Sequence, residues 1–402
     1  MNLNKTIIIG GGAAGFFSAI HNKQQNPDSD VIIIEKSKSI LSKVKISGGG
    51  RCNVTHACYD PTILCEFYPR GGKELRGPFY TFQPKDTVEW FEKNGVKLKT
   101  EADNRMFPVS NSSQTIIDCL VSRAAELGIK VWTECDVFTV KKEGDTFKLS
   151  ISNNQEIICE KLILATGSSR AGYQFAQNLG HTILPPKPSL FSFKINDKDL
   201  HNRKGVAVNM ARVWIENRRK KAQEGPLLVT HWGLSGPSII KLSAWEAEYL
   251  YDVSYTVNCK VNWLPAFSEE QIIQMLSKHK QTTKKVLSQS PFEEIPLRLW
   301  QYLTKKAEIK QTKTWNEISQ TNINRLVTEL HAGTYPISGK GQFKEEFVTC
   351  GGVNLKEINF KTMESKVCKG LHIIGELLNI DGVTGGFNFQ NAWTTGYLSQ
   401  FR

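Results

Sequence analysis

The amino-acid sequence predicts an α/β protein built on a parallel β-sheet. Three stretches of the 402-residue chain carry this prediction. Residues 7–9 and 31–34 are short, wholly apolar runs rich in β-branched side chains. Residues 161–164 form a third run, which is apolar after Lys161 and ends abruptly in small residues. Strands that are apolar along their whole length are typical of parallel sheets covered by helices on both faces.

The turn after the first strand carries the spacing G-x-G-x-x-G at Gly10, Gly12 and Gly15, and an apolar helix follows it. Gly10 permits a tight turn, Gly12 lets the backbone approach a pyrophosphate, and Gly15 lets the helix pack closely on the strand. Glu35 ends the second strand 20 residues after Gly15, where a carboxylate binds ribose hydroxyls and disfavours a 2′-phosphate. We therefore predict a dinucleotide site of the Rossmann type.

The length of the chain predicts two or three domains, since single cores rarely exceed roughly 250–300 residues. The sequence also predicts a cytoplasmic protein. No stretch of the sequence approaches the roughly 18 apolar residues of a membrane span, and no apolar leader precedes the glycines. The nine cysteines are odd in number and scattered, with no C-x-x-C spacing. This pattern favours reduced thiols and argues against a zinc ribbon or a redox-active dithiol.

The net charge of +12 is much larger than the binding of one anionic cofactor would require, so it needs another explanation. Residues 190–332 carry 21 Lys/Arg and 14 Asp/Glu, which is +7 of the total. The densest clusters are residues 217–221, 284–285 and 305–306. Two interpretations stay open: a polyanionic substrate such as RNA, or a basic surface that aids solubility.

Glycine and amphipathic patterns place the remaining elements of the first half. The triplet at residues 48–50, flanked by Lys43, Lys45 and Arg51, predicts a loop in close contact with a ligand. Within residues 84–99 we expect a helix that stops at Gly95 and then a strand at 96–98. A second helix is expected at 114–127, a loop at 104–108, a strand from 129, and a β-meander over 136–158.

The middle of the chain differs in composition from both ends. The Pro-rich residues 185–188 predict a crossing between domains. Short alternating runs over 190–262 then suggest a small β domain, and helical patterns continue from the N-cap Ser268 to about residue 330.

Two later stretches have the small residues that a bound dinucleotide requires. The apolar strand at 161–164 ends in Ala165, Thr166 and Gly167, a turn that can pass beneath a dinucleotide. Near the C-terminus, Gly385 and Gly386 open the last helix. Exposed amides and the positive dipole end of that helix would suit a flavin carbonyl that gains negative charge on reduction.

With these stretches in hand, the sequence resembles the BaiN/RdsA family of NAD(P)/FAD-dependent oxidoreductases, which are two-dinucleotide-binding-domain flavoproteins. The matching motifs are residues 10–15, 47–55, 233–237 and 362–392, in order along the chain. The resemblance implies a discontinuous FAD-binding domain (1–189 plus 333–402), an inserted β-barrel-like domain (190–267) and an inserted helical domain (268–332). It also implies FAD as cofactor and NADH or NADPH as reductant.

Carried residue by residue onto this sequence, the resemblance implies that the FAD-binding positions are Gly10, Gly12, Ala13, Ala14, Gly15, Glu35, Lys36, Lys43, Gly49, Gly50, Arg51, Cys52, Asn53, Val137, Ala165, Thr166, Gly167, Gly375, Glu376, Asp381, Gly385, Gly386, Phe387, Asn388 and Gln390. No metal site and no catalytic residue are assigned. Cys52 and His231 are the titratable groups to test as proton donors.

The expected reaction moves a hydride from flavin N5 to an electron-poor C=C bond, with NAD(P)H as the source. A uracil base in ribosomal RNA is the first substrate hypothesis, because it uses the basic charge of the inserted region. A steroid-type enoate or an amine is the second hypothesis. A flavin-bearing binding protein without turnover is the third.

Overall fold

The computed structural model describes residues 4–280, 286, 289–310, 312–341 and 348–400. The chain divides into two compact units. We name Met1–Pro186 with Val348–Arg402 the sheet unit, and Lys187–Phe347 the barrel unit. Both ends of the chain therefore build the sheet unit, and the barrel unit is inserted between them.

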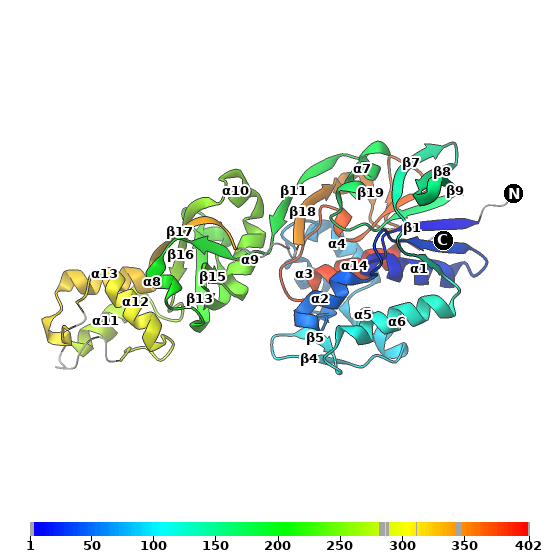
Figure 1. Cartoon of the computed structure of the whole chain (residues 1–402). Helices are drawn as coiled ribbons and strands as arrows, with labels where there is room; N and C mark the ends of the chain where they lie inside the picture. The colour runs from blue at the N-terminus through cyan, green and yellow to red at the C-terminus, as the bar shows by residue number, and fades with distance from the viewer. Residues whose placement is uncertain (1–3, 281–285, 287–288, 311, 342–347, 401–402) are drawn as a thin grey trace. The chain divides into compact units, whose positions relative to one another are not determined.

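The sheet unit contains both strands and helices, as its sequence predicts (Figure 1). Its elements up to the insertion are β1 Lys5–Ile9, α1 Ala13–Gln25, β2 Asp30–Ile34, α2 Ser42–Gly50, β3 Thr55–His56, α3 Pro61–Cys65, α4 Gly72–Thr81, α5 Pro84–Lys93, β4 Leu98–Thr100, β5 Arg105–Pro108, α6 Ser113–Glu126, β6 Lys130–Trp132, β7 Val137–Glu143, β8 Thr146–Ile151, β9 Gln155–Cys159, β10 Lys161–Leu164, α7 Arg170–Asn178 and β11 Ile183–Ser189. After the insertion come β18 Val348–Val353, β19 Ile358–Asn359, β20 Glu364–Ser365, β21 Leu371–Ile373, the 3-10 turn η6 Gly375–Leu377 and α14 Phe387–Leu398.

The central sheet has the order β19-β20-β21-β10-β1-β2-β6. Its five strands from β21 to β6 are parallel, so their carboxyl ends meet at one edge. The three apolar runs of the sequence analysis are β1, β2 and β10, side by side at its centre. The predicted meander forms β7-β8-β9, and β3-β5-β4 form a separate small sheet. The α/β class is confirmed.

Helices α1 and α14 come from opposite ends of the chain and pack against each other (Figure 1). Phe17 contacts Trp393 with ring centroids 5.2 Å apart, and one turn later His21 contacts Tyr397 at 5.0 Å. Both helices advance by four residues between these contacts, so they run in the same direction. Since α1 begins at the carboxyl edge of β1, the N-termini of both helices face the same end of the unit.

The barrel unit contains a closed six-stranded barrel of order β12-β15-β14-β13-β16-β17. Its strands are β12 Phe193–Ile195, β13 Ala207–Ile215, β14 Gln223–Val229, β15 Gly233–Ser235, β16 Thr256–Asn262 and β17 Gly333–Lys340. Its helices are α8 Lys198–His201, α9 Pro237–Trp245, α10 Ala247–Asp252, α11 Glu269–His279, α12 Leu297–Lys306 and α13 Gln320–Ala332. The expected Ser268 cap is present, with a capping box to Gln271.

Two details differ from the sequence interpretation. Gly333–Lys340, expected in the FAD-binding domain, is the barrel strand β17, which pairs with β16 and β12 and closes the barrel. The loop expected at 104–108 contains β5, because Met106 and Phe107 pair with β4 and bury their side chains.

The barrel and the inserted helices share one hydrophobic core, which includes Trp263 and Trp300. None of the helices in the described part of the chain combines the length and apolarity needed to cross a bilayer.

Candidate functional site

The three motif glycines after β1 have different reasons to lack a side chain. A Cβ on Gly10, whose φ is +115°, would lie 2.4 Å from Ala165 O, and one on Gly15 would lie 2.0 Å from Gly10 O. These two positions hold the turn tightly against β10 and α1. A Cβ on Gly12 would meet no atom within 4 Å. Gly12 therefore faces open space at the N-terminus of α1, where unpaired helix amides attract anions.

Glu35 lies beside this turn, at the carboxyl end of β2. Its Oε2 accepts a hydrogen bond from Gly11 N at 2.8 Å, and its Oε1 accepts from Ser37 N at 2.9 Å. Cys135 N donates to Glu35 O at 3.1 Å, which brings the start of the meander at Val137 to the same edge. Lys36 is exposed next to it.

The Ala165 to Gly167 turn lies directly under the first turn, since Ala165 N donates to Ile9 O at 2.9 Å. Thr166 Oγ1 is buried and has no hydrogen-bond partner among the residues that the structure describes. Gly167 has φ +58°. A buried hydroxyl without a partner is costly, so Thr166 fits a site that a polar ligand completes.

The glycine triplet is non-helical although it ends α2. Ser47 is extended, and Gly48, Gly49 and Gly50 all have φ between 56° and 83°. A Cβ on Gly49 or Gly50 would meet nothing within 4 Å, so both expose bare backbone. The predicted open glycine loop is therefore present.

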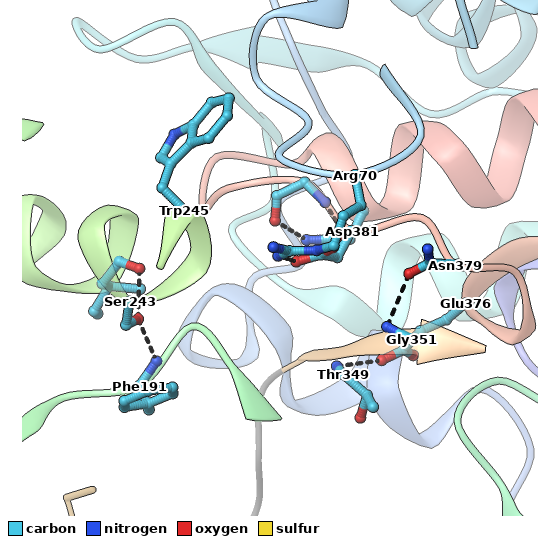
Figure 2. Close-up of polar contacts among 12 residues, drawn as sticks. Arg70, Phe191, Ser243, Trp245, Thr349, Gly351, Glu376, Asn379 and Asp381 are labelled. Atoms are coloured by element: carbon cyan, nitrogen blue, oxygen red, sulfur yellow. Dashed lines mark hydrogen bonds and ion pairs between the residues drawn. The ribbon is translucent and has the colours of Figure 1, made fainter. Parts of the chain in front are cut away.

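Glu376 lies on η6, beside the first turn of α1. A Cβ on the preceding Gly375 would be 3.0 Å from Ala14 Cβ. Glu376 Oε2 pairs with Lys43 Nζ at 2.5 Å. Its Oε1 accepts a hydrogen bond from Thr349 N at 3.2 Å, as Figure 2 shows. Two predicted site residues from distant parts of the sequence, Lys43 and Glu376, thus meet here.

The N-terminus of α14 is held by Asn53 from the segment after the triplet. In the amide orientation that satisfies its neighbours, Asn53 Oδ1 accepts from Gly386 N at 3.0 Å, and its Nδ2 donates to Thr55 O. Gly385 and Gly386 have φ +138° and +96°, and a Cβ on Gly386 would be 2.6 Å from Thr55 O. The first amides of α14 beyond Gly386 have no partner within a helix and are available to an acceptor.

A segment that sequence reasoning missed fixes the loop before α14. We name residues 67–71 the brace. Arg70 forms a buried two-point ion pair with Asp381, which Figure 2 shows. Tyr68 Oη donates to Phe387 O at 2.6 Å, and Val383 N donates to Phe67 O at 2.9 Å. The sequence signal was an arginine between Pro69 and two glycines.

Four of the side chains expected to bind the cofactor are held by contacts with other residues of the protein. Asp381 is fully buried against Arg70. Asn388 exchanges two hydrogen bonds with Gly382, both 2.9 Å long. The Gln390 side chain is buried and contacts Thr55, Thr87 and Thr394. The Phe387 ring stacks on Phe67, with centroids 4.4 Å apart. These four side chains build the end of the site and do not point into open space.

The two proton-donor candidates differ in surroundings. Cys52 is buried at φ +59°, and burial raises the pKa of its thiol to about 12. It is therefore a neutral, inaccessible thiol near pH 7. His231 is exposed on the turn between β14 and β15, with its ring edge-on to Trp232 at 4.2 Å. Within the described residues, no group of three His, Cys, Asp or Glu side chains could hold a metal ion.

The basic clusters of the barrel unit are largely paired. Arg218 and Lys221 both reach the buried Glu246, at 2.8 Å and 3.8 Å. Lys305 pairs with Asp199, and Lys306 with Glu329, each at 2.7 Å. Residues 284–285 lie outside the described part of the chain. These carboxylates therefore neutralise part of the positive charge in the clusters that the sequence indicates.

Comparison with known proteins agrees with this geometry. A family model described as the HI0933-like protein Rossmann domain matches residues 4–400, and the chain belongs to that family. The family resemblance seen in the sequence is thereby confirmed. Its members are flavoprotein oxidoreductases, so the chain is an enzyme of this class.

Three similar proteins illustrate the family and the fold. A 3-dehydro-bile acid delta(4,6)-reductase of Clostridium scindens is 26% identical, covering 99% of this chain and 98% of its own. A ribosomal RNA dihydrouridine synthase of Haemophilus influenzae is 29% identical, covering 98% and 97%. The crystal structure of a 3-ketosteroid-delta4-(5alpha)-dehydrogenase from Rhodococcus jostii is 12% identical, covers 99% of this chain and 96% of that one, and has a TM-score of 0.51. This last likeness shows the fold alone.

Proposed function

We propose that the chain binds FAD across the carboxyl edge of its sheet. The observation that carries this proposal is the parallel packing of α1 and α14, which directs two helix N-termini, one from each chain end, toward the same end of the unit. One cradle suits a pyrophosphate and the other an electron-rich carbonyl. A long cofactor with anionic and carbonyl groups at separate positions fits both.

In this proposal, Gly10 to Gly15 and Glu35 hold the adenosine diphosphate half, with Lys36 and Val137 at its outer edge. Thr166 supplies the buried hydroxyl that lacks a partner among the residues described by the structure. The paired side chains of Lys43 and Glu376 bind the middle of the cofactor. Gly49, Gly50, Arg51 and the amides of α14 surround the ring system. Asp381, Asn388 and Gln390 act by supporting these groups.

When bound, FAD supplies two-electron hydride chemistry, and we propose NADH or NADPH as the source of the hydride. The protein contributes binding, orientation and electrostatics. The amides of α14 stabilise negative charge that develops at their acceptor, since a helix N-terminus carries partial positive charge. Cys52 is too deeply buried and too weakly acidic to serve as the proton donor.

We propose a uracil base in RNA as the substrate. Two relatives at 28% and 29% identity are named ribosomal RNA dihydrouridine synthases, and both are covered almost completely. Forming dihydrouridine reduces a C=C bond conjugated to a carbonyl group. The net charge of +12 also favours a polyanionic partner.

A small conjugated enone is the second candidate, favoured by the reductase relative at 26% identity over 99% of the chain. Both candidates need the same bond type to be reduced. They differ in whether the substrate carries phosphates.

Measuring dihydrouridine in ribosomal RNA separates the two candidates. RNA from cells lacking the gene, and from the same cells carrying it on a plasmid, is digested and analysed by mass spectrometry. We expect one dihydrouridine signal to disappear on deletion and to return with the plasmid. Unchanged dihydrouridine in both strains would exclude the RNA substrate and leave the enone.

A further inference from the structure

A basic face lies beside the glycine triplet in the sheet unit, built on the buried ring of Phe107. The Arg51 guanidinium lies 4.0 Å from the centroid of this ring, and that of Arg105 lies 5.4 Å from it. A Cβ on Gly48 would be 3.0 Å from the edge of the same ring. Phe107 therefore fixes two arginines next to the open backbone of the triplet.

A third cation belongs to this face. Lys99 on β4 is directly opposite Phe107 on β5, and directly opposed residues of an antiparallel pair project on the same side of a sheet. Lys99 has no ion-pair partner within 4.0 Å among the described residues, as the ion pairs of this part of the chain involve its neighbours. We name Arg51, Lys99 and Arg105 the Phe107 face.

The carboxylates around this face only partly balance it. Glu101 pairs with Arg51 at 2.6 Å and with Arg105 at 3.4 Å, so one carboxylate is shared by two guanidinium groups. Asp103 pairs with Arg105 at 2.7 Å and is 56% exposed. Three cations and two carboxylates leave one positive charge. Each guanidinium also has more N–H donors than these contacts use.

We propose that the Phe107 face binds a phosphodiester of single-stranded RNA next to the base that is reduced. This inference rests on the proposed RNA substrate. Guanidinium groups held over an aromatic ring bind phosphate in a more fixed geometry than a flexible surface lysine provides. The face adjoins the glycine triplet, where the proposed function places the flavin ring system. A phosphate held here would position its base at the reacting edge.

If the Phe107 face binds phosphate, RNA binding does not depend on the basic clusters of the barrel unit alone. Arg218, Lys221, Lys305 and Lys306 are engaged by carboxylates, whereas Lys99 has no ion-pair partner in the described part of the chain and the two guanidinium groups have unused donors. Glu101 acts as an internal competitor for the phosphate, since both bind the same two arginines. Removing its charge is expected to strengthen RNA binding.

The test uses the full-length protein and a fluorescein-labelled oligouridylate of about 12 nucleotides, within the usual range of single-strand sites. Binding is measured by fluorescence anisotropy across salt concentrations. We expect the double variant Lys99→Gln/Arg105→Gln to bind at least about tenfold more weakly, and its salt slope to fall by about 0.7, because it removes one phosphate contact and each such contact on a single strand contributes about 0.7. Glu101→Gln is expected to bind severalfold more tightly.

Arg219→Gln/Lys220→Gln is the matched control, because it removes two exposed charges from the barrel unit. We expect it to bind like the wild type, and flavin content and circular dichroism to be equal in all variants. Equal loss in both double variants, or weaker binding by Glu101→Gln, would overturn the Phe107 face and leave the RNA substrate standing. A wild-type protein that does not bind the oligouridylate at all would refute both.

Discussion

At the level of single residues, the glycines of the first turn separate folding from ligand binding. Gly10 and Gly15 approach backbone oxygens so closely that any side chain must move the turn. Gly12, at φ −92°, has ordinary backbone and open space around its Cβ position. Gly10 and Gly15 are therefore required by the fold, whereas in our proposal Gly12 is required by the ligand.

Two single substitutions test this division. Gly12→Ala is expected to fold with an unfolding free energy within about 1 kcal/mol of the wild type, since it changes only a helix N-cap. Its methyl group would occupy the space needed by a pyrophosphate, so FAD affinity is expected to fall at least tenfold. Gly15→Ala is expected to lose at least about 2 kcal/mol of stability as well. Urea unfolding and flavin titration measure both effects, and normal FAD affinity in Gly12→Ala would contradict the assignment.

At the level of elements, the brace holds the loop that leads into α14 and so positions the N-terminus of this helix. Phe67, Tyr68 and Arg70 each hold a different point between Asp381 and Phe387. The Arg70–Asp381 pair is buried, with 11% and 0% of the two side chains exposed. Breaking one half of a buried pair leaves an uncompensated charge.

Arg70→Met is expected to destabilise the sheet unit by about 3–5 kcal/mol and to weaken FAD binding, because the loop before α14 loses its anchor. Arg212→Met is the comparison, since its pair with Glu224 is 41% and 45% exposed. Exposed pairs contribute at most about 1 kcal/mol, so this variant is expected to remain near wild type. Thermal unfolding with and without added FAD measures both. Equal effects of the two substitutions would argue against a positioning role for Arg70.

The sequence could predict the elements that have their own periodicity. The apolar strands β1, β2 and β10, the meander and the glycine turns were found because each has a local pattern. The brace was missed because its function depends on contacts more than 300 positions away, such as Tyr68 with Phe387. Strand β17 was assigned to the wrong unit for a related reason, since barrel closure is a pairing with β12 and β16 that no local pattern contains. The strand β5 was missed because it is short and polar at its start.

At the level of the whole molecule, buried histidines are expected to make the stability sensitive to acid. Burial lowers the pKa of His21 to about 4 and that of His372 to about 3. An unfolded histidine binds a proton below about pH 6.5, while these folded histidines stay neutral to lower pH. The unfolded state therefore binds more protons between pH 6.5 and 4, and stability falls as the pH drops through this range.

Each of these two histidines is expected to cost about 2 kcal/mol of unfolding free energy between pH 6.5 and 5. His21 lies among Phe17, Phe82, Trp90 and Tyr397, so His21→Phe keeps an aromatic ring in an aromatic cluster. This variant is expected to lose about 2 kcal/mol less than the wild type over the same pH range. Urea titrations at pH 6.5 and pH 5 give the difference, and an unchanged acid sensitivity would show that His21 is not responsible.

We propose that both chain ends form one FAD site and that NAD(P)H reduces the bound flavin. An anaerobic absorbance titration of the purified full-length protein, reconstituted with FAD, tests it most directly. We predict the absorption bands of protein-bound flavin, followed by their bleaching when NADH or NADPH is added. A protein that retains no FAD after reconstitution, or a bound flavin that stays oxidised with both nucleotides, would contradict the account.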